Sequence, residues 1–279
     1  MFKHRTSLEI PEELWRKIST HVSKRRRSAF MLEAIKEKLV KEAMKVVILC
    51  GGVGMQMRPL TFSSPKSMLP LGYKPLLEHM LTFYKQQGFY NFILLVGYLG
   101  EQIIKYFGDG SSLGVKIDYV GEKERLGTAG ALRNARDILN STFVCSFGDI
   151  VISGLDLKEM IQYHRERGGI ATMLLSRVDD VRRFGYVEID DKHRITNFIE
   201  KPRFPRRGLV SAGLFILEPA IFDYIEKRRK YVTLEDDVFP ELIDSEKLFG
   251  FIHSGYWVDV GSPQDYEKAL RDFMTKKIF

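Results

Sequence analysis

The sequence predicts an α/β fold, in which a Rossmann-like, mostly parallel sheet carries helices on both faces and is joined by a smaller lobe. A short β-α-α module precedes it. Three observations lead to this fold. Segments typical of strands and helices alternate from residue 45 onward. The first strand, residues 45–50, is a continuous apolar run, which is typical of a parallel strand buried on both faces. The 279 residues are 44% hydrophobic and 28% charged, as in ordinary globular proteins. We expect two domains, residues 1–44 and 45–279.

The positive charge is concentrated in the N-terminal segment. Of the formal net charge of +7, residues 1–44 carry +5, with 11 Lys or Arg and 6 Glu, and the other 235 residues carry +2. A basic appendage on a near-neutral body indicates either contact with nucleic acid or solubility alone.

The cellular compartment is predicted from the absence of a membrane-spanning run and of a signal segment in the sequence. No apolar run approaches the about 18 residues needed to span a membrane, and residues 1–5 lead into no apolar signal segment. Cys50 and Cys145 each lie inside an apolar run and are expected to be buried thiols. We therefore expect a cytoplasmic protein without a membrane partner.

The N-terminal segment has its own pattern. Residues 5–10 alternate polar and apolar side chains, which predicts a short strand. Pro11 and the acidic pair after it suit the start of a helix, and Ser28 is a suitable N-cap for a second helix reaching about Met44. One strand and two helices cannot close a core, so the pattern predicts pairing with a second copy.

This segment resembles the ribbon-helix-helix module over about residues 3–43. The resemblance implies an obligate homodimer whose paired strands lie in the major groove of DNA. Arg5, Ser7 and Glu9 would then face the groove, where Glu9 is unfavourable beside phosphates. Dimerisation alone and dimerisation with DNA binding both remain open.

In the body, the apolar pattern predicts the elements in order. Helices are expected at 76–87, 101–107 and 129–139, alternating with strands at 92–96, 115–120 and 143–147. After residue 170 the pattern is strand-rich, with strands at 171–175, 186–189, 195–199 and 210–217, which would form a smaller mixed sheet. Helices at 235–242 and 263–273 follow.

Gly51-Gly-Val-Gly54, directly after the first strand, is a candidate phosphate-binding loop, because successive glycines let backbone N–H groups point at an anion. It matches neither Gly-x-Gly-x-x-Gly nor the Walker A pattern, and a plain turn stays open. The long loop that follows, with Arg58-Pro-Leu-Thr and Pro65-Lys66, is unusual unless it covers a ligand.

These segments resemble the nucleoside-diphosphate-sugar pyrophosphorylases (sugar-1-phosphate nucleotidyltransferases), and the resemblance covers residues 45–275. It continues in order through Lys74-Pro-Leu-Leu-Glu-His, Leu126-Gly-Thr-Ala-Gly130, Phe147-Gly-Asp149, Phe184-Gly-Tyr186, Ile199-Glu-Lys-Pro202, Ser211-Ala-Gly213 and Gly255-Tyr-Trp-Val-Asp-Val-Gly261. It implies one α/β domain with a sugar-binding lobe that joins a nucleoside triphosphate to a sugar 1-phosphate and releases pyrophosphate.

The resemblance also implies roles for individual residues. Mg²⁺ would be held by Asp149 and Asp259, since a hard cation needs carboxylate oxygens and both follow strand ends. The attacking phosphate oxygen is already ionised, so catalysis is alignment and charge neutralisation. The expected catalytic residues are Lys66, Asp149, Asp259 and Arg58; the nucleotide-binding residues are Leu49, Gly51, Gly52, Gly54, Gln56, Glu122, Gly127 and Thr128; the sugar-phosphate-binding residues are Gly185, Glu200, Lys201 and Ser211.

Two positions bear on the substrate and on activity. Glu122 stands where the thymidine and uridine enzymes carry Gln; a carboxylate only accepts hydrogen bonds, which suits the two adjacent donors of guanine and favours GTP and the mannose-1-phosphate guanylyltransferase branch. The family loop reads Gly-x-Gly-Thr-Arg-Leu, whereas this chain has Met55 and Gln56, with Arg58 a possible replacement. Three interpretations remain: a guanylyltransferase, a UTP- or dTTP-dependent member, and a catalytically weakened sugar-nucleotide sensor or DNA-binding regulator.

Overall fold

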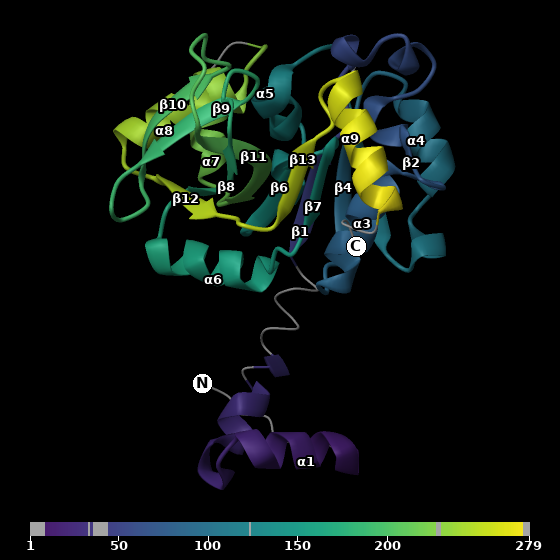
Figure 1. The fold of residues 1–279 in the computed structure, drawn as a ribbon. Coiled ribbons are helices and arrows are strands. Elements are labelled where there is room, and N and C mark those ends of the chain that lie inside the picture. The colour runs from purple at the N-terminus through teal and green to yellow at the C-terminus, as the bar shows by residue number, and fades with distance from the viewer. Residues whose placement is uncertain (1–8, 33, 36–43, 123, 227–229, 276–279) are drawn as a thin grey trace. The chain divides into compact units, whose positions relative to one another are not determined.

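The computed structural model describes residues 9–32, 34–35, 44–122, 124–226 and 230–275 (Figure 1). The chain divides into two compact units, Met1–Ala43 and Met44–Phe279. Among the described residues, no helix is both long and apolar enough to cross a membrane.

The N-terminal unit is helical where it is described. Helix α1, Glu12–His21, begins directly after Pro11 and has two acidic residues in its first turn, as expected. A 3₁₀ turn, Lys24–Arg26, leads into a second helix that includes residues 27–32 and 34–35. Most of the predicted strand at 5–10 lies outside the described residues, and its last two residues, 9 and 10, are not in a strand.

The body is built on a nine-stranded sheet whose central part is parallel. The strands of this parallel part lie in the order β6-β1-β4-β5. They are β1 at Lys45–Leu49, β4 at Asn91–Val96, β5 at Lys116–Gly121 and β6 at Phe143–Phe147. Residue 47 on β1 pairs with residue 93 on β4 and with residue 145 on β6. The predicted βαβ order is confirmed here.

The strand-rich half extends this sheet and does not form a separate one, which corrects that expectation. Strand β11, Gly208–Leu217, runs antiparallel to β6 and also pairs with β8, Ala171–Val178, and β9, Gly185–Ile189. Strands β10, Ile195–Glu200, and β12, Leu248–Ile252, complete it. Because β11 is ten residues long, it reaches from the parallel half into the second lobe.

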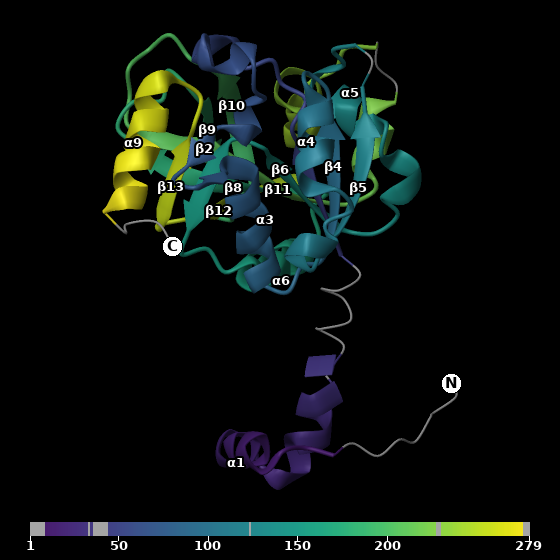
Figure 2. The same ribbon diagram turned by 90° about the vertical axis from the view of Figure 1, so that its right-hand side faces the viewer.

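Helices cover both faces of the sheet, so alternate residues of β1 enter different cores. Val46 and Ile48 pack with α3 (Leu76–Gln86), α4 (Gly100–Phe107) and α6 (Leu157–Arg167) on one face (Figure 2). Val47 packs on the other face with α5 (Gly127–Arg133), α7 (Ile221–Ile225) and α8 (Phe239–Asp244). Both faces are buried, which explains the continuous apolar sequence of this strand.

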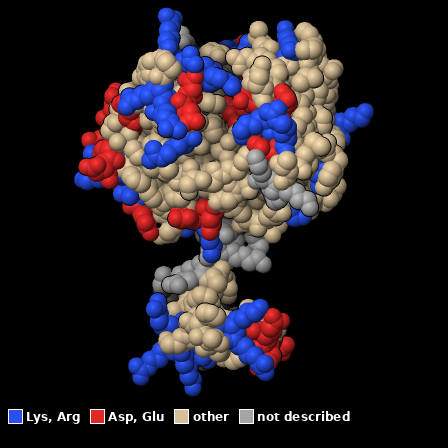
Figure 3. Space-filling view, viewed as in Figure 1, with Lys and Arg blue, Asp and Glu red and all other residues tan. Residues whose placement is uncertain are grey.

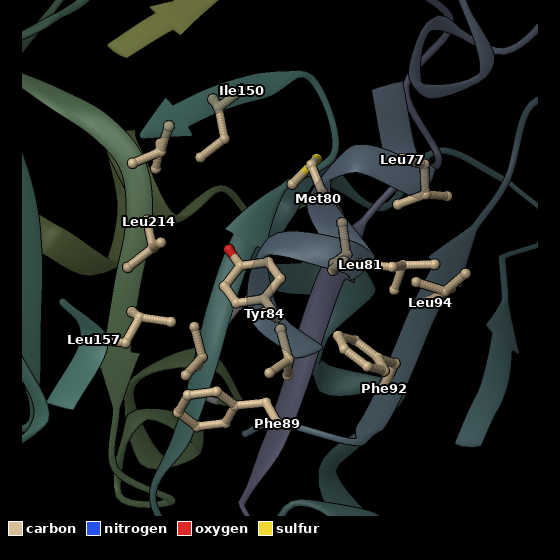
Figure 4. Close-up of a cluster of buried hydrophobic side chains, with 14 of the residues drawn as sticks. Leu77, Met80, Leu81, Tyr84, Phe89, Phe92, Leu94, Ile150, Leu157 and Leu214 are labelled. Carbon is tan, nitrogen blue, oxygen red and sulfur yellow. The ribbon is translucent and has the colours of Figure 1, made fainter. Parts of the chain in front are cut away.

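The first of these cores is centred on α3. Leu77, Leu81 and Tyr84 project from α3 toward Phe92 and Leu94 on β4 (Figure 4). These residues are fully or almost fully buried, so α3 is fixed against the strands whose ends carry the candidate site.

Several elements differ from the sequence prediction. Strand β7, Ile150–Ser153, pairs antiparallel with β13, Tyr256–Asp259, and this two-stranded ribbon was not predicted. Helix α5 ends at Arg133, and a π-turn, Leu234–Val238, precedes α8. The other elements are strands β2 (Pro70–Leu71) and β3 (Lys74–Pro75), helix α9 (Pro263–Met274) and 3₁₀ turns at Met55–Met57, Leu60–Phe62, Lys66–Met68, Ser111–Leu113 and Arg136–Ile138.

Candidate active site

A cleft of about 650 Å³ opens at the carboxyl ends of the parallel strands. Leu49, Leu95 and Phe147, at or next to the last positions of β1, β4 and β6, line it, and this edge is where α/β sheets hold ligands. The cleft is also lined by most of the predicted site residues: Gly51, Gly52, Gln56, Lys66, Glu122, Gly127, Thr128, Asp149, Gly185, Glu200, Lys201, Ser211 and Asp259. Arg58 and Gly54 are not among the lining residues.

Lys66, Asp149 and Asp259 meet in this cleft although they are far apart in sequence. Asp149 lies between β6 and β7, and Asp259 ends β13. The β7–β13 ribbon brings them together, because Asp259 pairs with Ile150 and the Val260 N–H donates to the Asp149 carbonyl at 2.9 Å. Lys66 starts a 3₁₀ turn, and its ammonium forms an ion pair with Asp149 Oδ2.

The charges in this group depend on one another. Burial disfavours the charge on Lys66, but the carboxylates of Asp149 and Asp259 outweigh burial, and the pKa of Lys66 is raised. Burial, and then the charge of Asp149, raise the pKa of Asp259. The Oδ1 atom of Asp259 is buried without a hydrogen-bond partner. A second cation at the two carboxylates would relieve this repulsion and satisfy that oxygen.

The glycine loop lies beside this group. Gly51 and Gly52 line the cleft, and Gln56 reaches it from the next turn. Gly54 shapes the loop: its φ of +64° is left-handed, and its carbonyl accepts a 2.7 Å hydrogen bond from the Thr61 hydroxyl. The Arg58 guanidinium instead stacks over the Phe62 ring, 4.8 Å from its centroid. The arginine expected to replace the missing charge therefore points elsewhere.

Glu122 is held over the start of the glycine loop. One carboxylate oxygen accepts from the Leu126 N–H at 3.3 Å. The other lies so close to Gly51 and Gly97 that a Cβ on either would approach it within 2.6 or 2.7 Å. Partial burial raises the pKa of Glu122, against smaller opposing contributions from Leu126 and Arg125.

The Thr128 hydroxyl forms hydrogen bonds to other residues of the protein. Its Oγ1 donates to Glu235 Oε2 at 2.7 Å and accepts from the Leu234 N–H at 2.8 Å. Gly127, with φ +78°, packs against the Val232 carbonyl, where a Cβ would clash at 2.3 Å. The first residues of α5, Gly127 and Thr128, therefore anchor the segment carrying Glu235, whose pKa burial raises to about 7.

The four residues predicted to hold the sugar phosphate lie together on the second lobe. Lys201 adopts a left-handed φ of +46°, uncommon for a non-glycine residue, and its Nζ lies 3.2 Å from Glu200 Oε1. Ser211 stands at a register shift of β11, which turns that strand at the cleft wall. Gly185 has a packing role, since a Cβ there would meet the Phe198 ring at 2.4 Å.

Sequence reasoning overlooked several lining residues that carry charge. These are Arg125, Arg182, Arg183, Glu235 and Asp236. Three of them lie next to a recognised motif: Arg182 and Arg183 precede Phe184-Gly-Tyr186, and Arg125 precedes Leu126-Gly-Thr. Glu235 and Asp236 lie near none of the motifs. For these three arginines, proximity in sequence to a motif is the signal that could have identified them as lining residues. Figure 3 shows acidic and basic side chains interspersed on the body.

The candidate DNA-facing residues are largely beyond what the structure describes. Arg5 and Ser7 lie outside the described residues, and Glu9 is exposed. A groove of about 910 Å³ does occur in the N-terminal unit, lined by apolar residues of both helices that include Leu14, Ile18, Phe30 and Ile35.

A parallel sheet with a glycine loop, a lysine and two carboxylates at its carboxyl edge defines the class of nucleotide-binding α/β proteins. Residues 45–276 match the family model described as Nucleotidyl transferase, and the chain belongs to this family.

Known relatives agree with this membership. The chain is 37% identical to a mannose-1-phosphate guanylyltransferase of Mycobacterium tuberculosis, over 82% of this chain and 64% of the relative. It is 36% identical to a UTP–glucose-1-phosphate uridylyltransferase of Synechocystis, over 84% of this chain and 64% of the relative. It thus spans less than two thirds of the length of these two relatives. The crystal structure of HddC from Yersinia pseudotuberculosis complexed with GMP-PN is 30% identical, with a TM-score of 0.70 over 82% of this chain and 99% of that chain.

Proposed function

We propose that this protein is a sugar-1-phosphate nucleotidyltransferase that makes a nucleoside-diphosphate sugar and pyrophosphate. The observation that carries it is the meeting of Lys66, Asp149 and Asp259 beside the glycine loop, in a cleft whose other wall holds Glu200 and Lys201. A cleft of this size suits a nucleotide with a sugar phosphate.

The reaction requires alignment of the two substrates and positive charge near their phosphates. An ionised oxygen of the sugar 1-phosphate attacks the α-phosphorus of the triphosphate; a new P–O bond forms and the bond to the pyrophosphate leaving group breaks. Lys66 would neutralise charge on the phosphates, and Lys201 would hold the sugar phosphate from the second lobe. No general base is needed, because the nucleophile carries no proton at neutral pH.

The residues present fit a divalent cation of the Mg²⁺ type. Asp149, just before β7, and Asp259, at the end of the paired strand β13, supply carboxylate oxygens, and the buried Oδ1 of Asp259 has no hydrogen-bond partner. In the described part of the chain no cluster of three or more His, Cys, Asp or Glu residues is placed to hold a metal. Two carboxylates with phosphates and waters are the usual Mg²⁺ ligands. The ion would neutralise phosphate charge when bound.

Glu122 supports GTP as the nucleotide. Its carboxylate lies beside Gly51 and Gly97, where a base would stack over the loop, and it can accept from two adjacent N–H donors of guanine. Guanylyltransferases among the relatives, and the HddC complex with GMP-PN, favour the same base. The uridylyltransferase relative keeps UTP as the alternative. Mannose 1-phosphate is the first sugar phosphate to test.

Pyrophosphate release by the pure protein with Mg²⁺ tests this function, across four nucleoside triphosphates and several hexose 1-phosphates. We expect turnover with GTP to exceed turnover with UTP and dTTP. In Glu122→Gln the ratio of kcat/KM for GTP to that for UTP should fall at least about 10-fold. An unchanged ratio would remove Glu122 from base recognition. Binding of GDP-mannose without turnover of any nucleotide would support the sensor interpretation and overturn the enzyme.

For the N-terminal unit we propose self-association. Within its described residues Ile18 is the buried hydrophobic residue, whereas Leu14, Phe30, Leu32 and Ile35 are 43–54% exposed. A unit of this size rarely folds on so small a core. A second copy of the chain is present at the same concentration and would supply the missing apolar face. The groove between the two helices would then pack against the same groove of the second copy.

Light scattering tests the association. Full-length protein should have at least twice the monomer mass, and a variant lacking residues 1–43 or carrying Leu14→Glu should have less. Arg16→Glu is the matched control and should keep the mass, since Arg16 lies on the same helix, is exposed and does not line the groove. An unchanged mass in both test variants would reject association through this unit.

Lys and Arg spread over the visible face of this unit (Figure 3). Duplex DNA binding that weakens steeply with salt would extend the proposal to DNA contact.

A further inference from the structure

A pair of charged residues connects the two walls of the cleft. Arg183 lies just before β9, in the loop that leads to Gly185, and Asp265 lies in the first turn of α9, just after the strand that ends at Asp259. The Arg183 guanidinium donates to Asp265 Oδ1 at 3.0 Å and to the Ser262 hydroxyl at 3.1 Å, and its Nη2 also contacts Asp265 Oδ2. The partners are 82 residues apart in sequence.

Asp265 is held in place from its own side. Ser262 is the N-cap of α9: its hydroxyl accepts from the Asp265 N–H at 3.3 Å and donates to Asp265 Oδ2 at 2.6 Å. The Asp265 side chain is 16% exposed. A carboxylate in the first turn of a twelve-residue helix is further stabilised by the helix dipole. The orientation of Asp265 therefore does not depend on Arg183 alone.

A second contact runs beside the ion pair. Phe184 meets Trp257 edge to face, with 5.2 Å between ring centroids, and Trp257 Nε1 donates to the Ala212 carbonyl at 2.9 Å. The Phe184 carbonyl accepts from the Lys201 N–H at 3.1 Å. Arg183 and Phe184 thus join the segment holding Gly185 and Lys201 to the strand holding Asp259.

We propose that Arg183 and Asp265 form a positioning clamp that sets the separation between the sugar-phosphate wall and the carboxylates of the cleft. This inference rests on the proposed function, because the clamp would act on how the sugar 1-phosphate is aligned. The Arg183 side chain is 47% exposed, which limits what the ion pair adds to folding stability. Reacting groups misplaced by about 1 Å, in contrast, lose about 100-fold in rate.

Steady-state kinetics of the full chain with GTP and mannose 1-phosphate test the clamp. In Arg183→Ala we expect kcat/KM for the sugar phosphate to fall at least about 10-fold, with KM for GTP changed less than about twofold. Arg183→Lys should recover part of the loss, since it keeps the charge without the planar fork. Exchange of the two residues, Arg183→Asp with Asp265→Arg, should recover part as well.

Arg207→Ala is the matched control. Arg207 lies in the same lobe and pairs with Asp179 at 2.7 Å, both side chains are 84% exposed, and it does not line the cleft. Its kinetics should stay at the wild-type level. Equal losses for both substrates in Arg183→Ala, or the same loss in Arg207→Ala, would overturn the clamp.

A readout without turnover separates this inference from the proposed function. Amide hydrogen exchange of the free protein should become faster in both 182–187 and 256–262 when Arg183 is replaced by Ala, and unchanged in Arg207→Ala. Faster exchange in both segments would support the clamp even if no nucleotide is turned over. Unchanged exchange in both segments would reject it whatever the activity.

Discussion

The Lys66 ammonium forms an ion pair with the Asp149 carboxylate, at the point where the long loop after β1 crosses the end of β6. Both side chains are about one fifth exposed, at 22% and 18%. Asp259 lies close enough to raise the pKa of Lys66 as well. Lys66 thus interacts with both carboxylates, and a ligand bringing a divalent cation and phosphates would redistribute these charges.

Lys66→Ala should lower kcat by about 10²–10³-fold, because under the proposed function it removes a fixed positive charge next to the transferring phosphate. Pyrophosphate release at saturating GTP and mannose 1-phosphate measures it. Lys116→Ala is the control, since Lys116 pairs with Asp118 and its side chain is 68% exposed. A Lys66→Ala protein with wild-type kcat would place the phosphates elsewhere in the cleft.

Asp259→Asn should abolish the Mg²⁺-dependent rise in Tm while leaving Tm without metal at least as high as that of the wild type. The reason is that burial and the neighbouring Asp149 make the Asp259 carboxylate unfavourable until a cation binds. A metal that binds only the folded state stabilises it by about 2.7 kcal/mol at 100 times its Kd. Differential scanning fluorimetry with and without Mg²⁺ measures both effects, with exposed Asp118→Asn as the control. A normal metal shift in Asp259→Asn would exclude it as a ligand.

Much of the parallel half could be predicted from the sequence because its signals are local. The apolar run of β1 and the helical periodicity of α3 each arise from burial of neighbouring residues. The β7–β13 ribbon could not be predicted, since Ile150 pairs with Asp259 more than a hundred residues later. The motifs located Asp149 and Asp259, but only this non-local pairing makes them neighbours.

The site shows the same division between local and distant contacts. Gly51, Lys66 and Glu122 were found through motifs, and all three line the cleft. Arg58 was proposed from its sequence position, but its direction depends on Phe62, over which it stacks. Arg183 was overlooked because its partner, Asp265, lies on a distant helix.

Glu235→Gln should change how stability depends on pH. Burial raises the pKa of Glu235 from 4.5 to about 7, so the folded state holds this proton more tightly than the unfolded state. Stability from this group is therefore lost as pH rises from about 4.5 to about 7. Gln cannot ionise and still accepts from the Thr128 hydroxyl, so Tm of the variant relative to wild type should rise between pH 5 and pH 8. Exposed Asp191→Asn should show no such trend. A pH-independent difference in Glu235→Gln would mean that Glu235 is ionised throughout.

Gln56→Arg should raise kcat/KM at least about 10-fold, equivalent to about 1.4 kcal/mol of transition-state stabilisation. Gln56 lines the cleft, whereas Met55 does not and is 61% exposed, so the single substitution has a free path to the phosphates. An arginine restores both the charge and the planar fork that Gln lacks. Gln56→Lys, which adds the charge alone, should gain less, and Met55→Thr should gain nothing. Initial rates of pyrophosphate release with GTP and mannose 1-phosphate measure all three. If Gln56→Arg gains nothing while wild-type turnover is normal for the family, another cation of the cleft, such as Arg125, already serves the triphosphate. In that case Arg125→Ala should lower kcat/KM relative to the wild type.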